Sequence, residues 1–174
     1  YLYSVGADGK IVINNVKIKN HIEKVLYSSC NSIFIQISIS NNILISSEVN
    51  GTISLWDLNK TISKHEFING NYLGFSKAIS NFKNTDCIDA FISKVNYDFR
   101  ISFPYKLISR HKEVVRSVSF CPWNDKIFSS AGIDKYLRIW DSKTTMLLKE
   151  IKFNTPLYTL NWNTYREEIL LTLG

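Results

Sequence analysis

Three residue types that cooperate in hydrolysis stand near one another in the sequence: His111, Ser130 and Asp134. A serine activated by a histidine, which a carboxylate orients, is the arrangement of many hydrolases. Such a site also needs an exposed serine oxygen and an oxyanion hole, and the sequence has no GxSxG elbow to supply them. The alternative is that the stretch SSAGIDKYLRIWD, residues 129–141, is the signature of a repeated strand hairpin. We favour this alternative, and we expect no catalytic residues and no enzyme.

The composition points to β-strands. Of the 174 residues, 45% are hydrophobic and 13% are aromatic, which is enough to build the core of one domain. Val, Ile, Tyr, Phe and Trp are abundant, and these types favour half-buried pleated strands. The sequence therefore predicts an all-β protein.

Charge and cysteine content exclude several kinds of site. The formal net charge is +6, but the lysines and arginines are spread along the chain without a run typical of a nucleic-acid tail. The cysteines, Cys30, Cys87 and Cys121, are odd in number and lack a CxxC pair, so neither a disulfide framework nor a zinc site is predicted. The most apolar run, 32–47, is too short to span a bilayer as a helix. We expect an intracellular protein, cytoplasmic in the first instance, with a cytoskeletal or nuclear location as the alternative, and with no metal, no cofactor and no membrane insertion.

The sequence repeats with a period of about 42 residues, within the ~40–45 residues of propeller-type arrays. Trp56 and Trp140 lie two such periods apart. Asp8, Asn50 and Asp134 share one register in the same way, and Asp8 and Asn50 are each followed by Gly. Three turns therefore occupy one register of the repeat.

The strongest internal match sets residues 115–132 against residues 157–174, in which apolar, aromatic and small types coincide. Within the units, apolar residues recur at alternate or nearly alternate positions, as strands require. The best-patterned unit predicts four strands, at 114–120, 127–131, 136–140 and 146–152.

The period divides the chain into units, of which the first and the last are incomplete. The third is degenerate and offers only the hairpin AFISKVNYDFRISF, without a Trp-Asp pair. Alternatively, the stretch 61–110 holds a loop insertion, and loops on a rigid scaffold are where binding concentrates. The predicted units are approximately 1–28, 29–69, 70–109, 110–152 and 153–174.

The stretch HKEVVRSVSFCPWNDKIFSSAGIDKYLRIWD, residues 111–141, resembles a complete WD repeat, and ILISSEVNGTISLWD resembles the end of another. Both end in Trp-Asp, at Trp56 and Asp57 and at Trp140 and Asp141. The resemblance implies β-propeller blades, each a four-stranded antiparallel sheet. About four units cannot close the usual ring, so we expect part of a larger propeller. One departure is Arg110, where the family has Gly before the His.

The resemblance also implies roles for the residues of the apparent triad. Asp134 is expected to accept a hydrogen bond from His111, which links through Ser130 to the indole N–H of Trp140. Trp123 and Tyr165 stand at the same turn position of successive units. Aromatic side chains there can stack a base or cap a peptide, but we expect packing between neighbouring blades.

Propeller blades present rigid loops and no chemistry of their own, so the resemblance implies a scaffold that binds other proteins within a multiprotein complex. Acidic peptide segments or complex subunits are the expected partners, because a basic rim is predicted near His111. One alternative is a motor subunit that resembles dynein intermediate chains and binds dynein chains. Another is a chromatin- or nucleic-acid-associated module, although nucleic acid is not the expected partner. The residues of the predicted basic rim are Arg110, Lys112, Arg116 and Lys135.

Overall fold

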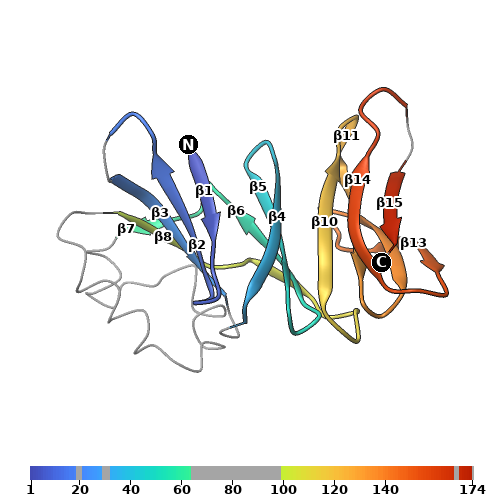
Figure 1. The fold of residues 1–174 in the computed structure, drawn as a ribbon. Helices are drawn as coiled ribbons and strands as arrows, with labels where there is room; N and C mark the ends of the chain where they lie inside the picture. The colour runs from blue at the N-terminus through green and yellow to red at the C-terminus, as the bar shows by residue number, and fades with distance from the viewer. Residues whose placement is uncertain (19–20, 29–31, 64–98, 167–168, 174) are drawn as a thin grey trace. The chain divides into compact units, whose positions relative to one another are not determined.

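A computed structural model describes the chain except for residues 19–20, 29–31, 64–98, 167–168 and 174. The regular elements in these described ranges are β-strands, β1 to β15 (Figure 1). No helix long and apolar enough to cross a membrane occurs within them. The all-β prediction is confirmed. The chain divides into two compact units, Tyr1–Ile33 with Trp56–Tyr105 and Phe34–Leu55 with Lys106–Gly174.

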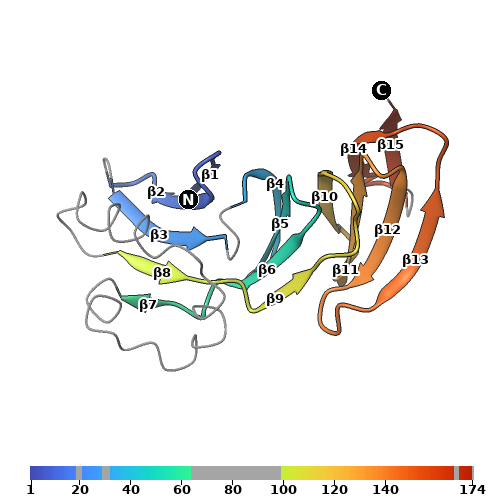
Figure 2. The same ribbon diagram turned by 90° about the horizontal axis from the view of Figure 1, so that it is seen from below.

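The first unit contains one sheet with the strand order β1-β2-β3-β8-β7. The first three strands pair antiparallel, whereas β8 joins β3 in parallel, with Val25 opposite Ile101. Figure 2 shows β8 between β3 and β7. Ile11, Val25, Leu26 and Ile101 are fully buried in this unit. The strands are β1 (Leu2–Val5), β2 (Lys10–Asn15), β3 (His21–Tyr27), β7 (Ile62–Ser63) and β8 (Arg100–Ser102).

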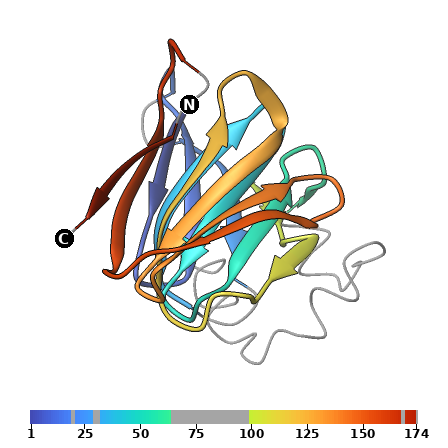
Figure 3. The ribbon, with the colours of Figure 1, turned by 90° about the vertical axis from the view of Figure 1, so that its right-hand side faces the viewer.

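The second unit holds two four-stranded sheets and a two-stranded one, in the orders β4-β5-β6-β9, β10-β11-β12-β13 and β14-β15. Figure 3 shows the twist of the sheet β10–β13, in yellow to orange. Strand β6 crosses the boundary, since its last two residues belong to the first unit. The strands are β4 (Phe34–Ser40), β5 (Ile43–Glu48), β6 (Ile53–Asp57), β9 (Lys106–Ile108), β10 (Val115–Cys121), β11 (Asn124–Gly132), β12 (Tyr136–Asp141), β13 (Leu147–Lys152), β14 (Leu157–Trp162) and β15 (Ile169–Leu173).

The sheet β10–β13 contains the four strands expected between residues 114 and 152, each paired antiparallel with the next. It is a four-stranded blade of the predicted kind. The three turns in one register also share a backbone conformation. The residue after Asp8, Asn50 and Asp134 has a left-handed φ, of 70° at Gly9, 84° at Gly51 and 69° at Lys135.

The predicted third unit, 70–109, lies mostly outside the described residues, including the start of its hairpin. Its described strands pair elsewhere: β9 is the fourth strand of the sheet β4-β5-β6, with Ile53 opposite Ile108, and β8 joins β3. These pairings favour the alternative of an insertion, because the strand that follows β6 in its sheet comes from beyond residue 105. The five unit boundaries stay a prediction.

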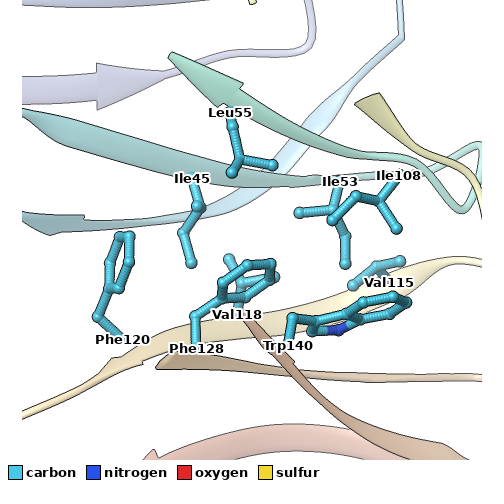
Figure 4. Packing of buried hydrophobic residues seen from close by; sticks show 9 residues of the cluster. All are labelled: Ile45, Ile53, Leu55, Ile108, Val115, Val118, Phe120, Phe128 and Trp140. Atoms are coloured by element: carbon cyan, nitrogen blue, oxygen red, sulfur yellow. The ribbon is translucent and has the colours of Figure 1, made fainter. Parts of the chain in front are cut away.

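Buried side chains from the two four-stranded sheets face each other in the second unit (Figure 4). A second cluster covers the opposite face of the sheet β10–β13, with Ala131 and Leu137 packed against Leu157 and Leu160 of β14. Because successive residues of a strand point to opposite faces, this sheet is buried on both sides. The first cluster is Ile45, Ile53, Leu55, Ile108, Val115, Val118, Phe120, Phe128 and Trp140.

The equivalent turn positions Gly51 and Lys135 predict opposite effects of substitution. A Cβ at Gly51 would lie 2.5 Å from the carbonyl oxygen of His111, so Gly51→Ala adds a backbone clash to a left-handed φ. We expect it to lower the free energy of unfolding by about 2 kcal/mol or more. Lys135→Gly relieves the left-handed cost of ~1–2 kcal/mol and loses ~0.5–1 kcal/mol in chain entropy, so it should be neutral or slightly stabilising. Urea unfolding measures both, and equal effects would contradict the turn geometry.

Candidate functional site

The four residues of the predicted network meet at one end of the sheet β10–β13. His111 follows β9 in the connection to β10, Ser130 lies on β11, and Asp134 lies in the turn between β11 and β12. His111 Nδ1 is 2.9 Å from Asp134 Oδ1, and His111 Nε2 is 2.8 Å from Ser130 Oγ. Trp140 Nε1 donates to Ser130 Oγ over 2.8 Å. The chain of contacts runs in the order that the resemblance implied.

The chemistry of the donors and acceptors indicates the direction of the hydrogen bonds between these four residues. The Asp134 carboxylate can only accept, so His111 Nδ1–H donates to it. Burial keeps the ring uncharged at neutral pH, so Nε2 accepts the proton of Ser130 Oγ, which itself accepts from the Trp140 indole. Arg138 Nη1, which can only donate, lies 2.6 Å from His111 Nδ1 and opposes a proton there. The imidazole is neutral, and the Asp134 carboxylate favours a proton on Nδ1 against the competing donor Arg138.

Arg138 completes the network, and the sequence analysis did not single it out. Its Nη1 donates to Asp134 Oδ2 over 2.7 Å, and its Nε donates to Glu150 Oε2 over 2.6 Å. The guanidinium also lies over the ring of Tyr136, 4.6 Å from the centroid. The residue is 4% exposed. A signal existed, because Arg138 shares the face of β12 with Trp140 two residues later, and a buried cation requires carboxylates nearby.

Burial and charge shift two pKa values in this network. Burial lowers the pKa of His111 below its ordinary value, and the positive charge of Arg138 adds to the effect against the opposing pull of Asp134 and Glu150. Burial alone would raise the pKa of Asp134, but hydrogen bonds from Arg138 and His111 outweigh it and hold that pKa below its ordinary value. At neutral pH the network contains a carboxylate, a guanidinium and an uncharged imidazole.

This arrangement does not form a hydrolase site. Ser130 is fully buried, and its oxygen already accepts from Trp140 and contacts His111. A substrate carbonyl cannot approach it, and the His111 side chain has no exposed surface. Within the part of the chain that the structure describes, no group of three or more His, Cys, Asp or Glu residues is placed to hold a metal ion.

The Trp-Asp pairs have structural surroundings. Trp56 and Trp140 are buried, at 0% and 2% exposure. The Asp141 carboxylate accepts from the backbone N–H groups of Lys143 and Thr144 and from the Thr144 hydroxyl, and these bonds lower the pKa of Asp141. Asp57 accepts in the same way from the backbone N–H of Asn59. Both carboxylates close the turn that follows their strand.

The predicted basic rim is only partly a cluster. Lys112 and Lys135 are exposed and follow the bonded pair His111 and Asp134, and Arg110 precedes that pair. Arg110 has 57% of its side chain exposed, and its Nε lies 3.9 Å from Glu150. The exposed Glu113 lies beside Lys112, so carboxylates interrupt the rim.

Arg116, the remaining residue of the predicted rim, lies on β10 and contacts another aromatic group. Its guanidinium lies over the ring of Tyr158 on β14, 5.4 Å from the centroid. We therefore assign it to the surface between β10 and β14, and we keep Arg110, Lys112 and Lys135 as the basic rim.

The pKa directions predict a loss of stability in acid. The unfolded chain binds a proton at His111 near pH 6.5, whereas the folded chain does so only at lower pH. Stability should therefore fall as the pH drops below about 6.5, and fall further below about 3.9, where Asp134 in the unfolded chain takes up its proton. Urea unfolding between pH 7.5 and 5.5, compared with His111→Asn, measures the first step. An equal pH dependence of parent and variant would contradict the burial of a neutral His111.

Removing the carboxylate of the network should destabilise the fold. Asp134→Ala leaves His111 Nδ1–H without its acceptor and Arg138 with one carboxylate fewer, so we expect a loss of about 1–3 kcal/mol. Asp8→Ala is a matched control in the equivalent turn, since Asp8 is 58% exposed and pairs only with Lys10 among described residues. The control should lose at most about 1 kcal/mol. Thermal unfolding decides, and equal melting temperatures of Asp134→Ala and the parent would refute the structural role.

Comparisons with known proteins agree with this geometry. Residues 103–141 match the family described as "WD domain, G-beta repeat". Over 71 residues the chain is 30% identical to the meiosis-specific APC/C activator protein AMA1 of Saccharomyces cerevisiae, covering 40% of this chain and 12% of that protein. Over 80 residues it is 26% identical to the WD repeat-containing protein slp1 of Schizosaccharomyces pombe, covering 45% of this chain and 16% of that protein.

Among solved structures, the chain is similar to one in the "Crystal Structure of Mitotic Checkpoint Complex". The TM-score is 0.70 with 18% sequence identity, over 99% of this chain and 42% of that chain. The chain thus spans less than half of the solved relative and a smaller share of the two curated relatives. At this identity the structural match shows the fold. Residues 103–141 thus match one WD repeat, and the chain with its four-stranded sheets shares the fold of the solved relative.

Proposed function

We propose that the chain is a non-enzymatic protein-interaction scaffold, part of a subunit of an intracellular multiprotein complex. The observation that carries this proposal is the rigid end of the sheet β10–β13. There the buried network fixes the backbone of residues 111 and 134, and the adjacent side chains of Lys112 and Lys135 remain exposed. A fixed backbone that presents exposed charges suits the recognition of another protein.

The relatives support a role in cell-cycle complexes. One is named as an activator of the APC/C, and the solved structure is titled as a mitotic checkpoint complex. We propose that this chain takes part in an assembly of that class. The motor subunit that resembles dynein intermediate chains and the chromatin- or nucleic-acid-associated module are alternatives that the same experiment distinguishes.

The basic rim, Arg110, Lys112 and Lys135, favours acidic partner segments. These cations are exposed, and Arg110 lies 3.9 Å from Glu150, at the limit of an ion pair. Glu150 is held more closely by Arg138, over 2.6 Å, so the charge of Arg110 remains available to a partner. Glu113 and Glu150 add negative charge beside the rim, which selects for a partner whose carboxylates match the positions of the three cations.

Affinity purification of the full-length protein with mass spectrometry tests the function. The variant changes Arg110, Lys112 and Lys135 to Glu, and the control changes the exposed Lys17, Lys143 and Lys149 to Glu. We expect the rim variant to lose its main protein partners about ten-fold while it keeps the parent's melting temperature, and the control to retain them.

Different partners would redirect the proposal. Equal recovery of partners by both variants would contradict the role of the rim. Recovery of dynein chains would favour the motor alternative. Recovery of DNA or histones, with binding that falls steeply as salt rises, would favour the chromatin module.

A further inference from the structure

The second unit contains an open cavity at the end of β10 that lies away from the basic rim. Strand β10 begins at Val115, near the rim, and ends at Cys121, which lines the cavity. The cavity has a volume of about 510 Å³ and lies between the β4–β5 turn and the β10–β11 turn. This volume falls within the range of ligand pockets, ~300–1,000 Å³.

One carboxylate gives the cavity its charge. Asp125 is exposed and is the only charged residue among the described residues that line it. The side-chain amide of Asn41 donates to Asp125 Oδ2 over 2.8 Å and so fixes the carboxylate across the cavity. Asp125 Oδ1 accepts no hydrogen bond from the described part of the chain, which leaves it free for a ligand. The cavity is thus suited to a cation, although the protein as a whole is positively charged.

A partly exposed tryptophan lines the cavity together with this carboxylate. Trp123 lines the same cavity and is 38% exposed. The ring of Trp162 packs edge-on against it, with 6.2 Å between the centroids and an angle of 84° between the planes. This contact agrees with the expected packing between neighbours, but Tyr165, at the equivalent turn position, is 96% exposed and does not pack as expected. Trp123 is therefore held in place with part of its indole open.

The protein already combines these groups around a cation. The guanidinium of Arg138 lies over the Tyr136 ring at 4.6 Å and donates to the Glu150 carboxylate over 2.6 Å. An aromatic ring contributes a cation–π attraction, and a carboxylate accepts the charge-assisted hydrogen bond of the planar guanidinium. Trp123 and Asp125 supply the same two groups to the cavity, where the described residues supply no cation.

We propose that the cavity between the β4–β5 and β10–β11 turns binds an arginine side chain from a partner protein, with Asp125 accepting its hydrogen bonds and Trp123 stacking on its guanidinium. Arginine fits better than lysine, because its planar fork can stack and donate at the same time. The inference rests on the proposed function as a protein scaffold. It adds a second binding site, which prefers positive charge, whereas the basic rim prefers negative charge.

Nuclear magnetic resonance on the full-length protein, with its tryptophans labelled with nitrogen-15, tests this site. The probe is the capped peptide acetyl-Ala-Arg-Ala-amide, and the uncharged control replaces Arg with citrulline. Trp123→Phe identifies the indole N–H signal of Trp123. We expect a saturable shift of that signal with the arginine peptide, and an affinity about ten-fold lower for citrulline.

Two variants check the carboxylate. Asp125→Asn keeps an oxygen for the Asn41 amide and removes the charge, so it should weaken the arginine peptide about ten-fold without changing the melting temperature. Asp141→Asn, at the half-buried Asp of the Trp-Asp pair, should leave the affinity unchanged. Equal affinities for arginine and citrulline, equal affinities of Asp125→Asn and the parent, or no shift at millimolar peptide would each overturn the site. None of these results bears on the basic rim, because partner recovery by the rim variants depends on other residues.

Discussion

A charge that leaves water must meet an opposite charge and a full set of hydrogen bonds, and in this protein the constraint applies to Arg138. The guanidinium lies in a sheet that is covered on both faces, and its carboxylate partners come from the turn before β12 and from the neighbouring strand β13. Asp134 supplies one carboxylate and Glu150 the other. Asp134 is in turn fixed by His111, which reaches the core through Ser130 and Trp140. One buried cation therefore ties together the turn, the incoming connection and the hydrophobic core.

The buried network residues serve the fold, and the exposed residues of the turns are the ones that a partner can contact. The polar atoms of the residues that resemble a catalytic triad are hydrogen-bonded within the buried network, so they are not available to react with a substrate. What remains for a partner lies at the two ends of the strands, where the turns emerge. One end presents the basic rim. The other presents a carboxylate and a partly exposed indole in an open cavity. The proposed scaffold, with unlike charges at its two ends, would distinguish partners by the order of charges along their surface.

The sequence predicted the features that depend on local pattern. Alternating apolar residues located the four strands between 114 and 152, and the register of Asp8, Asn50 and Asp134 located equivalent turns. It did not predict that β9 completes the sheet of β4 to β6. The two paired strands, β6 and β9, are far apart in the sequence, and a local hydrophobic period cannot predict which distant strand a strand pairs with. Arg138 was missed, although it shares a strand face with Trp140, because an arginine in a strand is usually solvated. Tyr165 is more exposed than Trp123, its equivalent in the repeat, because tertiary packing and not the repeat decides which side chains surround each turn.

The protonation state of His111 tests the central claim most directly. Long-range proton–nitrogen correlation spectra of the imidazole at neutral pH distinguish the two neutral tautomers and the charged form. The account predicts a neutral ring with its proton on Nδ1, and a titration that begins only below the ordinary pKa of histidine. A proton on Nε2, or a ring already charged at neutral pH, would contradict the direction of the network from Trp140 to Asp134.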